Sequence, residues 1–217
     1  MALPKLLYGT QWALPSSSVM SKFRTKILQA VWGLSSKMRC QEVVLAVLHE
    51  PTAIDPSHAV ALRTVILSRR VLLKDRSRRI KFINNLETIL HRGLKTVKCP
   101  GPAHGFLRAT ALAGLSLQVV SEDVRVTTAT GASAMLFADP GPLVAQLVKE
   151  SSRYVILQCL SERVNMPAGS ERKPDRKDMI GISPLVDMQA TLSLLNARRP
   201  KEEGGGPLLS NKDKRVL

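Results

Sequence analysis

Apolar residues recur at steps of three and four through most of the first 93 residues, and this spacing constrains the fold more than any other feature. Such a period places the residues on one face of an α-helix. Asp55-Pro56 is a typical helix start and Gly93 a typical helix end. The pattern predicts helices at 18–34, 38–49, 56–73 and 76–92, the second closed by Pro51.

The apolar face of each predicted helix is expected to be buried. For the helix at 56–73 this face comprises Leu62, Val65, Ile66 and Leu73. For the helix at 76–92 it comprises Ile80, Ile83, Leu86 and Leu90. A long helix at 142–164 is expected to turn Leu143, Leu147, Val148, Val155, Leu157, Leu160 and Val164 inward.

The segment Cys99–Gly105 holds two prolines and two glycines in seven residues, and we expect it to interrupt regular structure. Beyond it the pattern predicts a short helix at 106–115 and another after Ser183. Residues 117–128 are the only β signal, because they alternate and are rich in β-branched side chains. The fold class is therefore mainly α with one minor β-hairpin or strand.

The positions of the Pro- and Gly-rich segments predict two folded units and a tail. The first is a basic helical unit at 1–98, followed by a Pro/Gly linker at 99–105. The second is a mostly helical unit at 106–196 that contains the strand. Residues 197–217, with their charges and three consecutive glycines, are expected to form a flexible tail.

Positive charge is concentrated in the first half of the chain. The 32 Lys and Arg residues exceed the 17 Asp and Glu by 15, which is more than solubility requires and indicates a polyanionic partner. Residues 1–100 carry a net charge of +12 and residues 101–217 only +3. Within 63–98 there are 11 basic and 2 acidic residues, so we expect the binding surface there.

The predicted nucleic-acid-binding residues are Arg63, Arg69, Arg70, Lys74, Arg76, Arg78, Arg79 and Lys81. If the helices at 56–73 and 76–92 are nearly continuous, four of these residues share one stripe, because they follow at steps of 7, 4 and 7. A basic stripe can follow phosphates without reading bases. With only Phe82 nearby for stacking, duplex or hybrid backbone is favoured over single strands. The alternative is an ordinary solvated helix face.

No complete catalytic, cofactor or metal site is evident in the sequence. The pair Cys99 and His104 supplies two zinc ligands where a structural site needs four. Asp139 before Pro140 is typical of a turn that enters a helix, and lacks the second carboxylate of a polymerase metal pair. The widely spaced cysteines indicate free thiols, with Cys40 and Cys159 expected to pack as small hydrophobic residues.

The lengths of the apolar stretches, and the residues that interrupt them, predict the cellular compartment. The longest continuous apolar run, Val43–Leu48, is far shorter than a membrane span, so no membrane partner is expected. Pro4 and Lys5 break the N-terminal apolar stretch, which argues against a secretion signal. We therefore expect a nuclear or cytoplasmic protein.

Several short motifs resemble, in order, the region after the polymerase palm in reverse transcriptases of non-LTR retrotransposons, especially the elements abundant in dinoflagellate genomes. The motifs that carry the resemblance are Leu3–Gly9, Ala30–Gly33, Arg39–Val44, Asp55-Pro56, Arg153, Arg172–Asp175, Asp178–Ile182 and Asp187–Thr191. The resemblance implies a helical thumb at 1–98 and a connector at 106–196, which grip the primer–template hybrid.

The same resemblance implies that this chain is not itself the catalyst of RNA-directed DNA synthesis. The catalytic aspartates of the family lie upstream of the region, and nothing in residues 1–217 matches them. A fragment or a decayed, non-functional copy would both fit. The alternative from another class is a stand-alone basic helical scaffold or adaptor that binds an acidic partner.

Overall fold

The computed structural model describes residues 15–32, 41–93, 101–164 and 183, and confirms a mainly α fold with a small antiparallel sheet. The helices are α2 (Ser17–Trp32), α3 (Gln41–Val43), the π-helix η1 (Val44–Leu48), α4 (Pro51–Ile54), α5 (Pro56–Leu72), α6 (Arg76–Arg92), α7 (Pro102–Leu112) and α8 (Gly141–Val164). The strands are β1 (Leu115–Val120), β2 (Asp123–Thr128) and β3 (Ser133–Met135).

Local capping chemistry sets the ends of α5 and α6, as the sequence predicts. The Asp55 carboxylate accepts a hydrogen bond of 2.9 Å from the amide of Ser57, with Pro56 in the first turn. Asp75 caps α6 by accepting from the amide of Arg78 at 3.1 Å. Gly93 ends α6 with φ +82°, a conformation that glycine adopts without steric cost.

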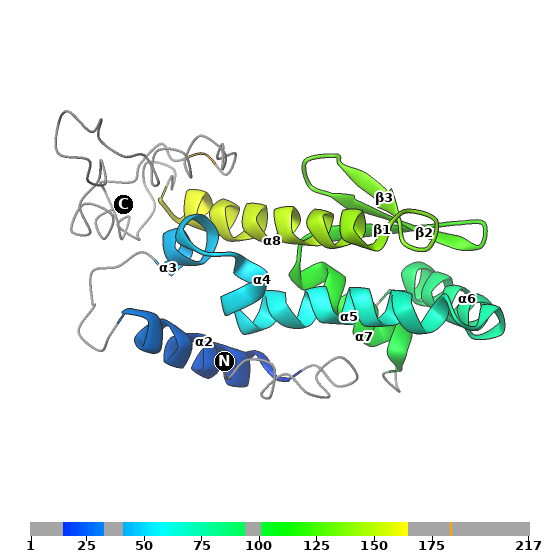
Figure 1. The fold of residues 1–217 in the computed structure, drawn as a ribbon, viewed down its shortest axis with the longest axis horizontal. Coiled ribbons are helices and arrows are strands. Elements are labelled where there is room, and N and C mark those ends of the chain that lie inside the picture. Colours follow the sequence, from blue (N-terminus) through cyan, green and yellow to red (C-terminus); the bar gives the residue numbers. More distant parts are fainter. Residues whose placement is uncertain (1–14, 33–40, 94–100, 165–182, 184–217) are drawn as a thin grey trace, which may run out of the picture.

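Helix α5 lies at the centre of the fold and packs against both α7 and α8 (Figure 1). Its buried side joins one apolar cluster with α6, α7, all three strands and α8. Phe106 of α7 is fully buried in this cluster and meets the ring of Phe82 of α6 edge-on, with centroids 5.4 Å apart. A single core therefore spans most of the described residues.

The predicted hairpin is confirmed, and a third strand extends it. Strands β1 and β2 pair antiparallel with Leu117 opposite Val126, and β2 pairs with β3 with Val126 opposite Ala134. Val124, Val126 and Ala134 are buried against the helices. Strand β3 has three residues, too few for an alternating pattern to reveal it.

The linker predicted at 99–105 is wrong for residues 102–105, which form the first turn of α7. Pro102 occupies the first turn, where its missing N–H costs nothing, and Ala103 and Phe106 bury the helix in the core. This burial offsets the low helix propensity of Gly105. Because α7 packs on α5 and α6, the two predicted units share one core and do not separate here.

In its described part, residues 41–49, the helix predicted at 38–49 is less regular than expected. It comprises α3 and the π-turn η1, and Pro51 begins the short helix α4 instead of only ending its predecessor. The side chain of Arg153 on α8 donates from Nε to the Ala46 carbonyl oxygen at 2.9 Å, which gives a carbonyl of the π-turn a partner. The predicted helix after Ser183 and the tail at 197–217 lie outside the described residues.

Several apolar residues predicted to face inward are exposed. The exposed residues of this group are Leu73, Ile80, Leu90 and Leu143. On α6 the buried face consists of Phe82, Ile83 and Leu86. Leu73 lies in the turn after α5 rather than in a helix. Cys159 is also exposed, because the neighbouring Leu157 and Leu160 take the buried side of α8. The periodicity of apolar residues alone does not predict which of them pack against another element of the fold.

Candidate nucleic-acid interface

Residues 69–81 hold seven basic residues and one acidic residue, and they form the corner between α5 and α6. Helix α6 lies beyond the C-terminal end of α5, at the end of the molecule opposite to α2 and α3 (Figure 1). The charge that the sequence places in one segment is therefore concentrated at one end of the fold.

The predicted stripe of Arg63, Arg70, Lys74 and Lys81 is wrong, because α5 and α6 are separate helices. Asp75 adopts an extended conformation, with φ −140° and ψ 102°, and starts α6 anew. Arg63 and Arg70 remain on α5, Lys74 lies in the turn, and Lys81 lies on α6. The basic residues therefore lie at the corner between α5 and α6 and not along one continuous helix.

Arg69 is used inside the fold. Its Nε donates to the Leu136 carbonyl oxygen at 2.8 Å, and its Nη2 donates to the Asp139 carbonyl oxygen at 2.6 Å. Both acceptors lie in the turn between β3 and α8, about seventy residues away along the chain. Arg69 therefore anchors this turn to α5 rather than presenting its charge to a ligand.

Arg76 and Arg79 are paired with Glu122 of the β1–β2 turn. Arg76 makes a forked contact, with Nη2 2.8 Å from Oε1 and Nε 3.2 Å from Oε2, and this hydrogen bonding lowers the pKa of Glu122. The Arg79 guanidinium is 3.8 Å from Glu122 and lies over the Phe137 ring, 5.5 Å from its centroid. Few acidic residues lie near these arginines in the sequence, but the fold brings Glu122 of the β1–β2 turn beside them.

Four of the predicted residues present their charge to solvent, and we call them the basic corner: Arg70, Lys74, Arg78 and Lys81. For Arg70, Lys74 and Lys81 the described part of the chain offers neither an ion pair nor a side-chain hydrogen bond. Arg78 is 2.9 Å from Asp75, but it is 73% exposed, so this pair is weak. Arg63 is half-buried on α5 and is not part of the corner.

Candidate catalytic and metal groups do not assemble among the described residues. The Asp139 carboxylate accepts from the Met135 amide at 2.6 Å, which confirms the turn predicted there. Across residues 15–32, 41–93, 101–164 and 183, no three His, Cys, Asp or Glu side chains gather as metal ligands would. His104 is half-buried on α7, and Cys99 lies outside the described residues. None of the described helices combines the length and apolarity of a membrane span.

Comparison with protein-family models, with curated proteins and with solved structures gives no match to this chain. The functional conclusion therefore depends on the charge and geometry of the described residues and on the motifs in the sequence. Of these, the basic corner is the feature with the clearest chemical meaning, because its side chains are cationic, exposed and close in sequence.

Proposed function

We propose that this chain binds the phosphate backbone of duplex nucleic acid or of an RNA–DNA hybrid, through the basic corner. The observation that carries the proposal is the exposure of Arg70, Lys74 and Lys81 without a carboxylate partner among the described residues. Cations of this kind displace the counterions condensed on a polyanion, and the released ions drive binding. Such contacts are independent of base sequence.

The geometry favours a rigid duplex over a flexible single strand. Phe82 follows Lys81 in the sequence, the Phe137 ring lies against the Arg79 guanidinium, and both aromatic side chains are buried. They are therefore not available for base stacking, which single-strand binders use. The pair between Arg78 and Asp75 is exposed and opens at little cost, so a phosphate can replace the carboxylate.

Within this proposal, the chain acts as the thumb and connector of a reverse-transcriptase-like retrotransposon protein, in the nucleus or cytoplasm, and leaves catalysis to another part of such a protein. The order of the sequence motifs and the helical form of the basic region support this assignment. Two residues of those motifs act in the fold, since Asp55 caps α5 and Arg153 holds the π-turn. The hybrid would then lie against the α5–α6 end.

The decisive experiment measures how the affinity for a duplex depends on salt. In the double variant Arg70→Glu/Lys74→Glu, the slope of log K against log salt should flatten by about two units, since each lost phosphate contact removes about 0.9. The matched control is Lys22→Glu/Lys26→Glu, which makes the same charge change at two exposed positions of α2. Circular dichroism verifies that both variants keep the native helix content.

Three outcomes would contradict the proposal. If the corner variant and the α2 control lose affinity equally and keep the same slope, only the net charge matters. A second outcome is that heparin displaces the chain from a duplex as well as a short duplex does, and that the affinity does not depend on duplex length. The corner is then better explained as the docking face of an adaptor for an acidic protein. A chain without helical signal or cooperative melting would instead be a decayed copy.

A further inference from the structure

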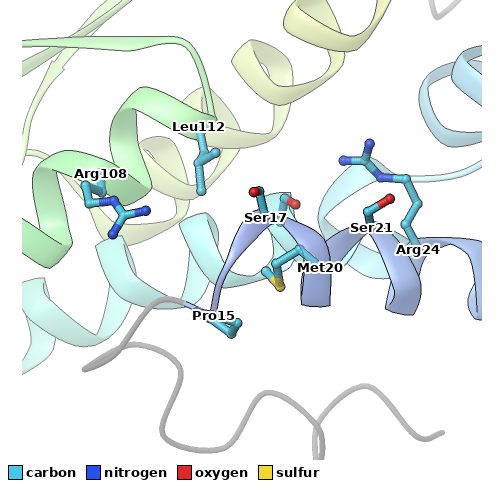
Figure 2. Close-up of a pocket in the computed structure, with 8 residues that line it drawn as sticks. Pro15, Ser17, Met20, Ser21, Arg24, Arg108 and Leu112 are labelled. Atoms are coloured by element: carbon cyan, nitrogen blue, oxygen red, sulfur yellow. The ribbon is translucent and has the colours of Figure 1, made fainter.

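A second electropositive feature lies away from the basic corner, in a pocket of about 210 Å³ between α2, the start of α5 and α7. Figure 2 shows the side chains of Arg108 and Leu112 entering from α7, and those of Ser17, Met20, Ser21 and Arg24 from α2. The pocket shares no residue with the basic corner, so its ligand does not depend on whether the corner binds a nucleic-acid backbone.

The polar lining of the pocket consists of groups that can donate hydrogen bonds. Arg108 is exposed, and the described residues give its guanidinium no carboxylate partner. The hydroxyls of Ser17, Ser21 and Ser57 likewise make no hydrogen bond with the described residues. No Asp or Glu lines the pocket itself, although the buried carboxylate of Asp55 lies against one of the two lining guanidiniums, that of Arg24.

Arg24 adds a guanidinium whose position is fixed in advance. Its Nη2 lies 2.7 Å from Oδ2 of Asp55, a carboxylate that is fully buried. This contact uses part of the five N–H donors of the guanidinium, and Nε is buried without a hydrogen-bond partner in the described chain. The ion pair with Asp55 fixes and neutralises this guanidinium, so Arg108 is the lining cation that has no carboxylate partner among the described residues.

The rest of the lining is apolar and consists of Pro15, Met20 and Leu112. Met20 is buried, whereas Leu112 exposes 43% of its surface beside the pocket. The volume corresponds to roughly seven water molecules, which leaves space for an organic substituent beside a single anionic group. The pocket therefore combines a donor-rich part with an apolar part.

We propose that this pocket binds a phosphate monoester. A phosphate monoester offers three terminal acceptor oxygens, which suit a guanidinium with several hydroxyls better than the two oxygens of a carboxylate. Arg108 holds the phosphate together with serine hydroxyls of the lining, and the organic substituent lies against Leu112. The phosphate belongs either to a small ester or to the phosphorylated end of a nucleic-acid strand.

The test titrates inorganic phosphate into the full chain by calorimetry, at pH 7.5 and at an ionic strength held constant with chloride. Wild-type protein should show saturable binding, and Arg108→Gln should weaken it about tenfold or more, as for a lost hydrogen bond to a charged group. Lys22→Gln is the matched control, because it removes the same charge from α2 outside the pocket lining. It should leave the affinity unchanged.

A second variant keeps the test decisive. Ser57→Ala removes one hydroxyl of the lining without changing the charge, and it should also weaken phosphate binding. Absence of saturable binding to wild-type protein would overturn the proposal, as would an equal effect of Arg108→Gln and Lys22→Gln. Arg108 is exposed, so its replacement is not expected to disturb folding, and a thermal melt verifies this.

The two sources of phosphate are separated with duplexes that carry either a 5′-phosphate or a 5′-hydroxyl. Tighter binding of the phosphorylated duplex, lost in Arg108→Gln, supports the proposal with a strand end as the ligand. Equal binding of both duplexes, together with saturable and Arg108-dependent binding of inorganic phosphate, supports it with a small ester as the ligand. The variant Arg70→Glu/Lys74→Glu should retain phosphate binding in the pocket, since neither residue lines it.

Discussion

Arg69 and Asp123 hold the same turn, between β3 and α8, through its opposite polar groups. Arg69 donates to the carbonyl oxygens of Leu136 and Asp139, whereas the Asp123 carboxylate accepts from the amides of Phe137 and Ala138, each at 2.9 Å. The cation thus satisfies carbonyls and the anion satisfies amides. This arrangement fixes the entry of α8 against both α5 and the sheet.

Replacing Arg69 should therefore destabilise the protein, whereas replacing its neighbour Arg70 should not. Arg69→Met leaves two carbonyls without their donor, and we expect a loss of about 1–3 kcal/mol in the free energy of unfolding. Arg70→Met, at an exposed position one residue away, should stay within about 0.5 kcal/mol of wild type. Urea unfolding of the three proteins measures both values. Equal losses would show that Arg69 is not an anchor.

Asp123 should matter more than the adjacent Glu122, although both are acidic residues of the same hairpin. Asp123→Ala removes the acceptor for three backbone amides, those of Val124, Phe137 and Ala138, at an expected cost of about 1–3 kcal/mol. Glu122→Ala breaks the ion pairs of a half-exposed carboxylate with Arg76 and Arg79, and should lower the unfolding midpoint much less. The reverse order of the two midpoints in a thermal melt would refute this assignment.

Gly114, in the turn between α7 and β1, should tolerate no side chain. It has φ +68°, and a Cβ there would collide with Cγ2 of Val155 on α8. Gly131 has φ +90° with no atom near its Cβ position, so Gly131→Ala measures the backbone cost alone, about 1–2 kcal/mol. Gly114→Ala should cost about 1–3 kcal/mol more because of the collision.

The excess cost of Gly114→Ala can be assigned to Val155 with a double variant. Val155→Ala removes the colliding methyl, so the two substitutions together should cost less than the sum of their separate effects. Calorimetric unfolding of the four proteins completes the cycle. Additive effects would place the strain in the backbone and not in the contact with Val155.

The buried histidine of α5 should make stability depend on pH below neutrality. Burial lowers the pKa of His58, the Asp55 carboxylate opposes this effect, and Arg24 adds to it. Because the pKa is lower in the folded state, the unfolded chain binds more protons as the pH falls below about 6.5. The contribution of His58 is therefore complete above that pH and is lost progressively below it.

Thermal melts between pH 7.5 and 5.5 test this dependence. The melting temperature of wild-type protein should fall over that range, and His58→Gln should reduce the fall. Titration of the His58 ring by NMR gives the folded-state pKa directly. A variant whose melting temperature falls as steeply as that of wild type would exclude His58 as the source.

Much of the secondary structure follows from local sequence. The caps at Asp55 and Gly93, the bounds of α5, α6 and α8, and the hairpin all depend on residues within a few positions of one another, so they can be predicted without tertiary information. The excess of positive charge in residues 69–81 is also a property of the sequence alone.

Which of those charged side chains form contacts inside the protein is determined only by the tertiary structure. Arg69, Arg76 and Arg79 find their partners 43 or more residues away, in turns that the fold brings to the α5–α6 corner. The same is true of Arg153, whose acceptor Ala46 is 107 residues away, and of the pocket that joins α2 to α7. Contacts across such distances depend on how helices pack, which no local pattern of residues encodes.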